Sequence, residues 1–178
     1  MKEWTAVCAI LLSFAVYGES PPEAPKFSVK DLEGEMVILD SLLSRGPVYV
    51  SFWAIWCKPC IRELDELAPI YEKYREKGLE LLAISEDGPR SIHRVKPLVR
   101  GKRWKFRVLL DLEKELLRAF QVVSLPTSFL IDRDGKIVNT YQGFKPGMEK
   151  LIEEELTKLL ADGEEEGGAD SEVKDQER

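Results

Sequence analysis

Two cysteines, Cys57 and Cys60, are separated by two residues and carry the clearest chemical signal in the sequence. They follow an apolar, β-branched and aromatic run at residues 47–53, which predicts a buried central strand. After them, apolar residues recur at helical spacing until Gly78. A C-x-x-C motif at such a strand–helix junction is typical of a redox-active dithiol. One helical turn would bring both sulfurs to the same end of the helix.

The two sulfurs are expected to play different roles. Cys57 falls at the helix start, where unpaired backbone N–H groups and the helix dipole stabilise an anion. Because the thiolate is the nucleophile, this position activates Cys57, and Lys58 adds a positive charge nearby. Pro59 suits the first helical turn, where its missing N–H has no consequence. Cys60, one turn further, is predicted to be more buried and to resolve the mixed disulfide that Cys57 forms.

Two structural interpretations of the cysteines are weaker. A structural zinc site requires four ligands, whereas the sequence beyond residue 18 offers two cysteines and one histidine, His93. A purely structural disulfide would be unusual across a two-residue gap. A body of roughly 140 residues can also bury a full core without a stabilising disulfide. We therefore predict no metal, and no cofactor other than the redox-active Cys57–Cys60 disulfide.

The surrounding sequence predicts an α/β fold. Strand-like and helical segments alternate from residue 26 to residue 160, and the last two strands form a hairpin over Asp134-Gly135. This order predicts one sheet with helices on both faces. The expected strands are residues 26–29, 36–39, 47–53, 79–84, 106–110, 127–131 and 136–141. The expected helices are one that ends before Gly78 and those at residues 91–100, 112–120 and 149–160.

The two ends of the chain are expected to lie outside this fold. Residues 5–17 form an apolar run that is too short to span a bilayer as a helix, which needs about 20 residues. The run suits a secretory signal cleaved after Gly18, with an uncleaved membrane tether as the alternative. Residues 162–178 hold eight acidic and two basic residues and no aromatic one. We expect a signal peptide or tether at 1–18, a folded domain at 19–161 and an acidic disordered tail at 162–178.

Charge is distributed unevenly along the chain. The tail accounts for the whole net charge of −6, so the neutral body gives no reason to expect binding to nucleic acid. From Arg90 to Arg107, however, the sequence has eight basic residues and no acidic one. A solvated helix face is the simpler interpretation. A docking surface for an acidic partner, an anionic membrane or the protein's own tail is the alternative.

The segment from Phe52 to Cys60 resembles the active-site region of the thioredoxin superfamily. Residues 24–27 and 31–34, and the segment between Ile84 and Phe106, are similar to the TlpA/ResA-like exported branch. The resemblance implies a thioredoxin-like fold: a central mixed β-sheet flanked by helices, an N-terminal β-hairpin and an insertion around residues 85–105. It also implies a protein disulfide oxidoreductase that works outside the cytoplasm, in the periplasm or cell envelope.

The resemblance assigns further site residues. The segment from Ser124 to Thr127 matches a loop in which a cis-proline faces the dithiol, and its backbone would hold an extended substrate segment. Glu63 matches a glutamate beside the dithiol, and its spacing from Cys60 places both on one helix face. Its carboxylate is a candidate to accept and return the Cys60 proton, with a solvated glutamate as the alternative. The residues expected to bind substrate are Trp56, Lys58, Pro59, Leu125 and Pro126.

Three positions depart from the family pattern. Ser51 stands where thioredoxin has a buried aspartate, so proton handling is not expected to rest on that position. Asp65 replaces a proline of many relatives, and Pro69 follows one turn later, which predicts a displaced or altered kink in the active-site helix. Ile55 replaces a residue that is usually small or polar.

These features predict that the enzyme reduces substrate disulfides rather than oxidising dithiols. A carboxylate at Glu63 and an apolar surround would both disfavour thiolates. By resemblance, the partners are disulfide-containing proteins, with apocytochrome c as the leading example, and a membrane thiol donor. The protein is expected to be a monomer. The apolar surround is expected to consist of Phe52, Trp53, Ile55 and Trp56.

Two activities of related folds fit less well. A peroxidase of the peroxiredoxin type needs a threonine or serine three residues before the reactive cysteine and a proline seven before it. This chain has Ala54 and Val50 at those positions. A copper-binding module of the Sco type needs three residues between the cysteines and a nearby histidine, whereas the gap here is two and His93 lies in the 85–105 segment.

Overall fold

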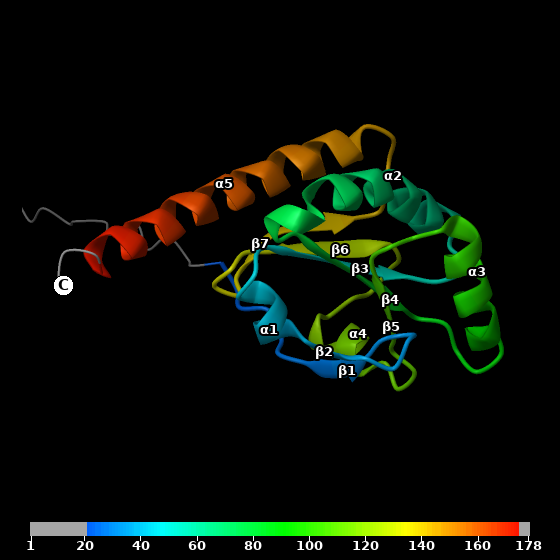
Figure 1. The fold of residues 1–178 in the computed structure, drawn as a ribbon. Helices are drawn as coiled ribbons and strands as arrows, with labels where there is room; N and C mark the ends of the chain where they lie inside the picture. The colour runs from blue at the N-terminus through cyan, green and yellow to red at the C-terminus, as the bar shows by residue number, and fades with distance from the viewer. Residues whose placement is uncertain (1–20, 175–178) are drawn as a thin grey trace, which may run out of the picture.

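The computed structural model describes residues 21–174, which Figure 1 shows as a ribbon, so the expected signal peptide lies outside the described residues. The strands are β1 (Ser28–Lys30), β2 (Met36–Ile38), β3 (Val48–Trp53), β4 (Glu80–Ser85), β5 (Arg107–Leu110), β6 (Thr127–Ile131) and β7 (Ile137–Gln142). The α-helices are α1 (Leu39–Leu43), α2 (Lys58–Tyr74), α3 (Val95–Lys102), α4 (Glu115–Ala119) and α5 (Met148–Lys174). Two short 3-10 helices are η1 (Arg75–Lys77) and η2 (Ile92–Arg94). Over residues 21–174, no helix combines the length and apolar character needed to cross a membrane.

Strand β3 is the centre of a five-stranded sheet with the order β5-β4-β3-β6-β7. It pairs in parallel with β4 and antiparallel with β6, and all of its residues are buried. Burial on both faces explains why its sequence is a continuous apolar run. Strand β4 pairs in parallel with β5, and β6 pairs antiparallel with β7. The mixed sheet confirms the predicted thioredoxin-like fold, as does the separate antiparallel pair of β1 and β2.

Alternate residues of β3 enter two hydrophobic clusters on opposite faces of the sheet. Tyr49 and Trp53 belong to the cluster that also contains the buried residues of α2 and α5. Val48, Val50 and Phe52 belong to the other, together with residues of α1 and α4. Figure 1 shows the same two layers, with α2 and α5 on one side of the sheet and α1, α4 and the β1–β2 pair on the other. Strand β3 therefore anchors both layers, and the redox motif follows directly at its end.

Helix α2 continues past Pro69 as a single helix to Tyr74. The proline thus lies inside the helix without ending it. Asp65 stands at the position where many relatives carry proline. Its side chain instead forms hydrogen bonds that connect α2 with the C-terminal end of α3 and the residues that follow it. Its carboxylate accepts from Trp104 Nε1 at 3.1 Å and from Lys102 Nζ at 2.5 Å.

Part of the basic stretch between Arg90 and Arg107 is paired within the folded body. Besides Lys102, Lys96 Nζ lies 2.9 Å from Glu33 Oε2 and donates to the Leu32 carbonyl. Arg107 lies 3.8 Å from Asp31 and 3.9 Å from Glu80. These pairs attach the N-terminal hairpin and α3 to the sheet, and a docking role for the remaining cations stays a prediction. The remaining exposed cations are Arg90, Arg94, Arg100, Arg103 and Lys105.

Helices α1, α3 and α4 differ from the sequence predictions. Helix α1 has five residues, which is too short for a helical period to be recognised. Residues 91–100 predict one helix, whereas the structure has η2 followed by α3, which ends where Arg103 adopts a positive φ of 59°. The helix predicted at residues 112–120 begins only at Glu115, because the preceding Lys114 adopts a positive φ of 56°. Asp111 accepts the N–H groups of Glu115 and Leu117 in its first turn.

Helix α5 is longer than the helix predicted at residues 149–160. Ile152, Leu156 and Leu160 bury one face of it against the cluster that includes Tyr49. Figure 1 shows α5 extending beyond the body of the molecule past this contact. The structure thus assigns helix up to Lys174, where the composition of residues 162–178 predicts no regular structure. The mobility of that segment stays a prediction.

Candidate active site

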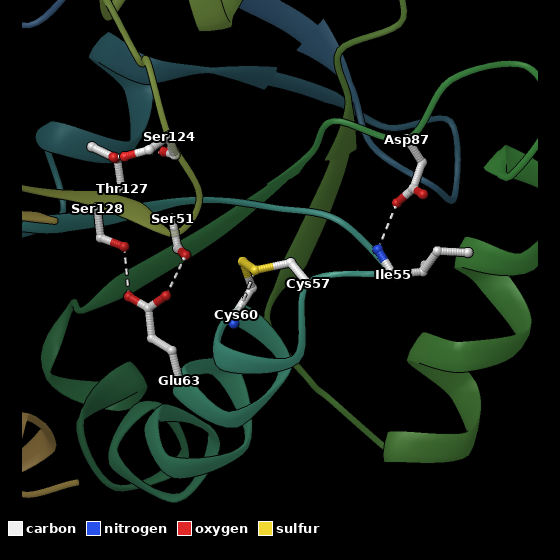
Figure 2. Close-up of a disulfide and its surroundings, with 9 residues drawn as sticks. All are labelled: Ser51, Ile55, Cys57, Cys60, Glu63, Asp87, Ser124, Thr127 and Ser128. Atoms are coloured by element: carbon white, nitrogen blue, oxygen red, sulfur yellow. Dashed lines mark hydrogen bonds between the residues drawn. A yellow bond between two sulfur atoms is a disulfide. The ribbon is translucent and has the colours of Figure 1, made fainter. Parts of the chain in front are cut away.

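Cys57 and Cys60 form a disulfide at the N-terminus of α2, with their Cα atoms 5.3 Å apart (Figure 2). Cys57 is the N-cap residue, and its Sγ accepts the N–H of Cys60 at 3.3 Å. Its side chain is 5% exposed, whereas that of Cys60 is 0% exposed. Cys60 is thus the more buried of the two, as predicted, and the roles of attacking and resolving thiol stay predictions. Lys58 and Pro59 occupy the first helical turn and are exposed, as predicted.

Glu63 projects from α2 toward the sheet and is buried, with 2% of its surface exposed. Its carboxyl accepts three hydrogen bonds from neutral hydroxyls: Tyr49 Oη at 2.9 Å, Ser51 Oγ at 3.1 Å and Ser128 Oγ at 2.5 Å. Burial raises the pKa of the Glu63 carboxyl, and the three hydroxyls only partly oppose this effect. Burial also raises the pKa of Tyr49, and the neighbouring Glu63 charge raises it further. Glu63 is therefore a buried carboxyl and not a solvated helix residue, and its role as acceptor of the Cys60 proton stays a prediction.

The hydrogen bonds around Glu63 change the interpretation of Ser51. Proton handling was not expected to rest on the Ser51 position, yet the Ser51 hydroxyl donates directly to Glu63. The glutamate of α2 therefore reaches the place on β3 where thioredoxin carries an aspartate. Figure 2 shows Ser51 and Ser128 meeting the carboxyl from two neighbouring strands, β3 and β6.

The expected apolar surround of the dithiol is only partly present. Trp53 is fully buried in the same cluster as Cys57 and Cys60. Phe52 faces the opposite side of the sheet, because successive residues of a strand alternate between its faces. Trp56 is 66% exposed, and Ile55 is half-buried. The prediction that all four residues surround the sulfurs is therefore wrong for Phe52, and Trp56 lies largely in solvent.

The Leu125–Pro126 peptide bond is cis, as the resemblance implies. Thr127 follows as the first residue of β6 and pairs with Phe52 near the end of β3, which brings Pro126 close to the redox motif. The Pro126 carbonyl accepts the Gly143 N–H at 2.8 Å. In the same loop, Leu125 is half-buried and Pro126 is buried, and the binding of substrate by these two residues stays a prediction.

Comparison with known proteins places the chain in a family. A model described as "AhpC/TSA family" matches residues 22–140. The "Thiol-disulfide oxidoreductase ResA" of Bacillus thuringiensis subsp. konkukian is 39% identical over 137 residues, which is 77% of this chain and 76% of that relative. The chain belongs to the ResA-like thiol–disulfide oxidoreductases of the AhpC/TSA family. The ResA of Bacillus subtilis is 31% identical over 146 residues, which is 82% of this chain and 78% of that relative.

Solved structures agree with the ResA-like assignment. A putative thiol:disulfide interchange protein DsbE from Chlorobium tepidum superposes with a TM-score of 0.72 at 29% identity, covering 79% of this chain and 96% of the other. The relatives and the Cys57–Cys60 pair together identify a protein disulfide oxidoreductase. The peroxidase alternative finds no support at the site, because the position three residues before Cys57 is the buried methyl group of Ala54.

Proposed function

We propose that this ResA-like protein reduces disulfide bonds of other proteins outside the cytoplasm. The observation that carries the direction is Glu63, a buried carboxyl near the dithiol whose three hydrogen-bond partners are neutral. Reduction of the disulfide creates thiolate, and a nearby carboxylate makes this second negative charge unfavourable. A less stable reduced form corresponds to a lower reduction potential and a stronger reductant.

The reaction consists of two thiol–disulfide exchanges. The Cys57 thiolate attacks one substrate sulfur, forms a mixed disulfide and releases the other substrate sulfur as a thiolate, which takes up a proton from water. Cys60 then gives its proton to Glu63 and attacks Cys57 Sγ, which releases the second substrate sulfur as a thiolate that takes up a proton from water. Two electrons pass to the substrate and the Cys57–Cys60 disulfide forms. Because burial raises the pKa of Glu63, its carboxylate is a stronger base for this step. Glu63 returns its proton to Cys60 when a donor thiol next reduces the Cys57–Cys60 disulfide.

The accessible residues around Cys57 favour an extended polypeptide as substrate. Trp56, Lys58 and Pro59 are exposed, and the loop with half-buried Leu125 and buried Pro126 leads into β6. We propose that these residues bind the polypeptide around its disulfide. Apocytochrome c awaiting haem is the leading substrate class, by resemblance to ResA-like proteins. The export of the chain rests on the apolar run at residues 5–17, and a membrane thiol donor would restore the dithiol. No further cofactor is required for these steps.

The redox state of the protein in cells tests this function. Acid-quenched cells are treated with a thiol-reactive polymer that adds mass for each free thiol. A reductase should carry two tags, on Cys57 and Cys60, in most molecules, because the donor keeps it reduced. The Cys60→Ser variant supplies the one-tag reference, and a Cys8→Ala variant shows whether the first 18 residues are retained. A protein that is mostly untagged until a chemical reductant is added would contradict the proposal.

A further inference from the structure

The segment from Ala54 to Cys57 is a tight turn that joins β3 to α2. The Cys57 N–H donates to the Ala54 carbonyl at 3.0 Å and closes this turn. The N–H of the second residue of such a turn is not used by the turn itself, so a buried one requires another partner. Here that residue is Ile55, and its N–H donates to Asp87 Oδ2 at 2.9 Å, as Figure 2 shows.

Asp87 is itself held firmly beside the end of β4. Its side chain is fully buried. Ser85 Oγ donates to the same Oδ2 at 3.0 Å, and the Asp87 N–H is 3.2 Å from Ser85 Oγ. The N–H of Glu86 donates to the Trp53 carbonyl at 2.7 Å. The carboxylate is therefore fixed relative to the last residue of β3, immediately before the redox turn.

The other oxygen of this carboxylate, Oδ1, is buried with no hydrogen-bond partner in the described part of the chain. A buried polar atom without a partner destabilises the folded protein. Stability alone therefore does not explain a carboxylate at this position. Its Oδ2, by contrast, accepts both the Ile55 N–H and the Ser85 hydroxyl. Its effect here is to hold the Ile55 N–H, and with it the redox turn.

We infer that Asp87 is a positioning residue for the nucleophile. By holding Ile55, it keeps the turn closed and places Cys57 Sγ at the N-terminus of α2, where the unpaired N–H groups stabilise the thiolate. Asp87 acts through the turn and not on the sulfur. The inference concerns the reactivity of Cys57 in the reduced protein, so it holds for either direction of electron flow and stands apart from the proposed reduction of substrates.

The test measures alkylation of Cys57 by iodoacetamide against pH in a Cys60→Ser background, which leaves one thiol in the folded domain. Asp87→Ala should slow alkylation at pH 7 about five-fold, because the thiolate loses part of its stabilisation by the helix terminus. The rate at about pH 10, where the thiol is ionised in both proteins, should be unchanged. Asp87→Asn keeps an acceptor for the Ile55 N–H and should stay within about two-fold of the parent protein.

A second variant removes the donor instead of the acceptor. Ile55→Pro lacks the N–H, and proline is favoured at the second position of a tight turn. It should slow alkylation as Asp87→Ala does, and the two changes together should have no larger effect than one alone. Asp132→Ala is the matched control, since Asp132 accepts two N–H groups in the β6–β7 turn away from the dithiol. It should lower the urea midpoint and leave alkylation unchanged.

Three results would overturn the inference. The first is an alkylation profile of Asp87→Ala that matches the parent protein while only the urea midpoint falls, because Asp87 would then be merely structural. The second is an Asp87→Asn variant that is alkylated as slowly as Asp87→Ala. This result would attribute the slower alkylation to the lost charge and not to the lost hydrogen bond of the Ile55 N–H. The third is full additivity of Asp87→Ala and Ile55→Pro. If Asp87→Ala fails to fold, Ile55→Pro tests the inference by itself, and parent-like alkylation of Ile55→Pro would overturn it.

Discussion

Cys57→Ser should lower disulfide reduction by roughly 10³-fold or more, because the substituted hydroxyl is a far weaker nucleophile than the thiolate and no second group replaces it. Cys60 cannot take over the attack, since its side chain is fully buried. The measurement is the rate of reduction of a disulfide-linked model peptide by the purified, pre-reduced protein. Residual activity within ten-fold of the parent protein would show that another thiol is the nucleophile.

Cys60→Ser should behave differently from Cys57→Ser in a trapping experiment. Without the resolving thiol, the first exchange still occurs, and the mixed disulfide between Cys57 and the substrate accumulates. Non-reducing gels of cell-envelope proteins should therefore show adducts for Cys60→Ser and none for Cys57→Ser. Mass spectrometry of these adducts would also identify the substrate class. Equal trapping by both variants would contradict the assigned order of attack.

Glu63→Gln should lower the rate of disulfide reduction about 100-fold, the usual contribution of a positioned general base. The amide cannot accept the Cys60 proton, although it keeps the size of the side chain and can still bond the hydroxyls of Tyr49, Ser51 and Ser128. Alkylation of Cys57 in the reduced protein should not become slower, because loss of the Glu63 charge does not disfavour the Cys57 thiolate. Glu66→Gln is the matched control, since Glu66 is an exposed glutamate of the same helix. Parent-like turnover of Glu63→Gln would remove Glu63 from the mechanism.

The same variant should be more stable than the parent protein at neutral pH. Burial raises the pKa of Glu63 in the folded state above its ordinary value of 4.5. Ionisation of Glu63 therefore opposes folding, and this penalty grows as the pH rises from 4.5 and is complete above the folded pKa. The urea midpoint of Glu63→Gln should exceed that of the parent at pH 8, and the difference should shrink at pH 4. A higher midpoint for the parent at pH 8 would contradict a buried, destabilised carboxylate.

The redox motif could be located from sequence because it lies where two periodic patterns meet. Strand β3 is buried throughout and α2 has a long apolar face, so both patterns are strong and their junction is sharply defined. Helix α1 has only five residues and gives no such pattern. The extent of α5 was also missed, because the glycine- and glutamate-rich composition after residue 161 favours disorder and contains no apolar stripe.

The partners of the site residues could be predicted less well than the residues themselves. The resemblance to ResA-like proteins identifies Glu63, but Ser128 is 65 positions away from Glu63 in sequence. Such a contact depends on how β6 pairs with β3, and no local pattern reports that pairing. Tyr49 and Ser51 carried a usable signal, since they alternate along β3 on the face that α2 covers. Period-two alternation would also have placed Phe52 on the opposite face.

The reduction potential of the Cys57–Cys60 disulfide tests the proposed reductase function most directly. It is measured by equilibrating the protein with defined ratios of reduced and oxidised dithiothreitol and counting free thiols. The buried Glu63 carboxyl predicts a value near or below that of thioredoxin, about −270 mV, and Glu63→Gln should raise it. A potential near that of the oxidant DsbA, about −120 mV, would show that the protein forms disulfides in its substrates and would contradict the proposal.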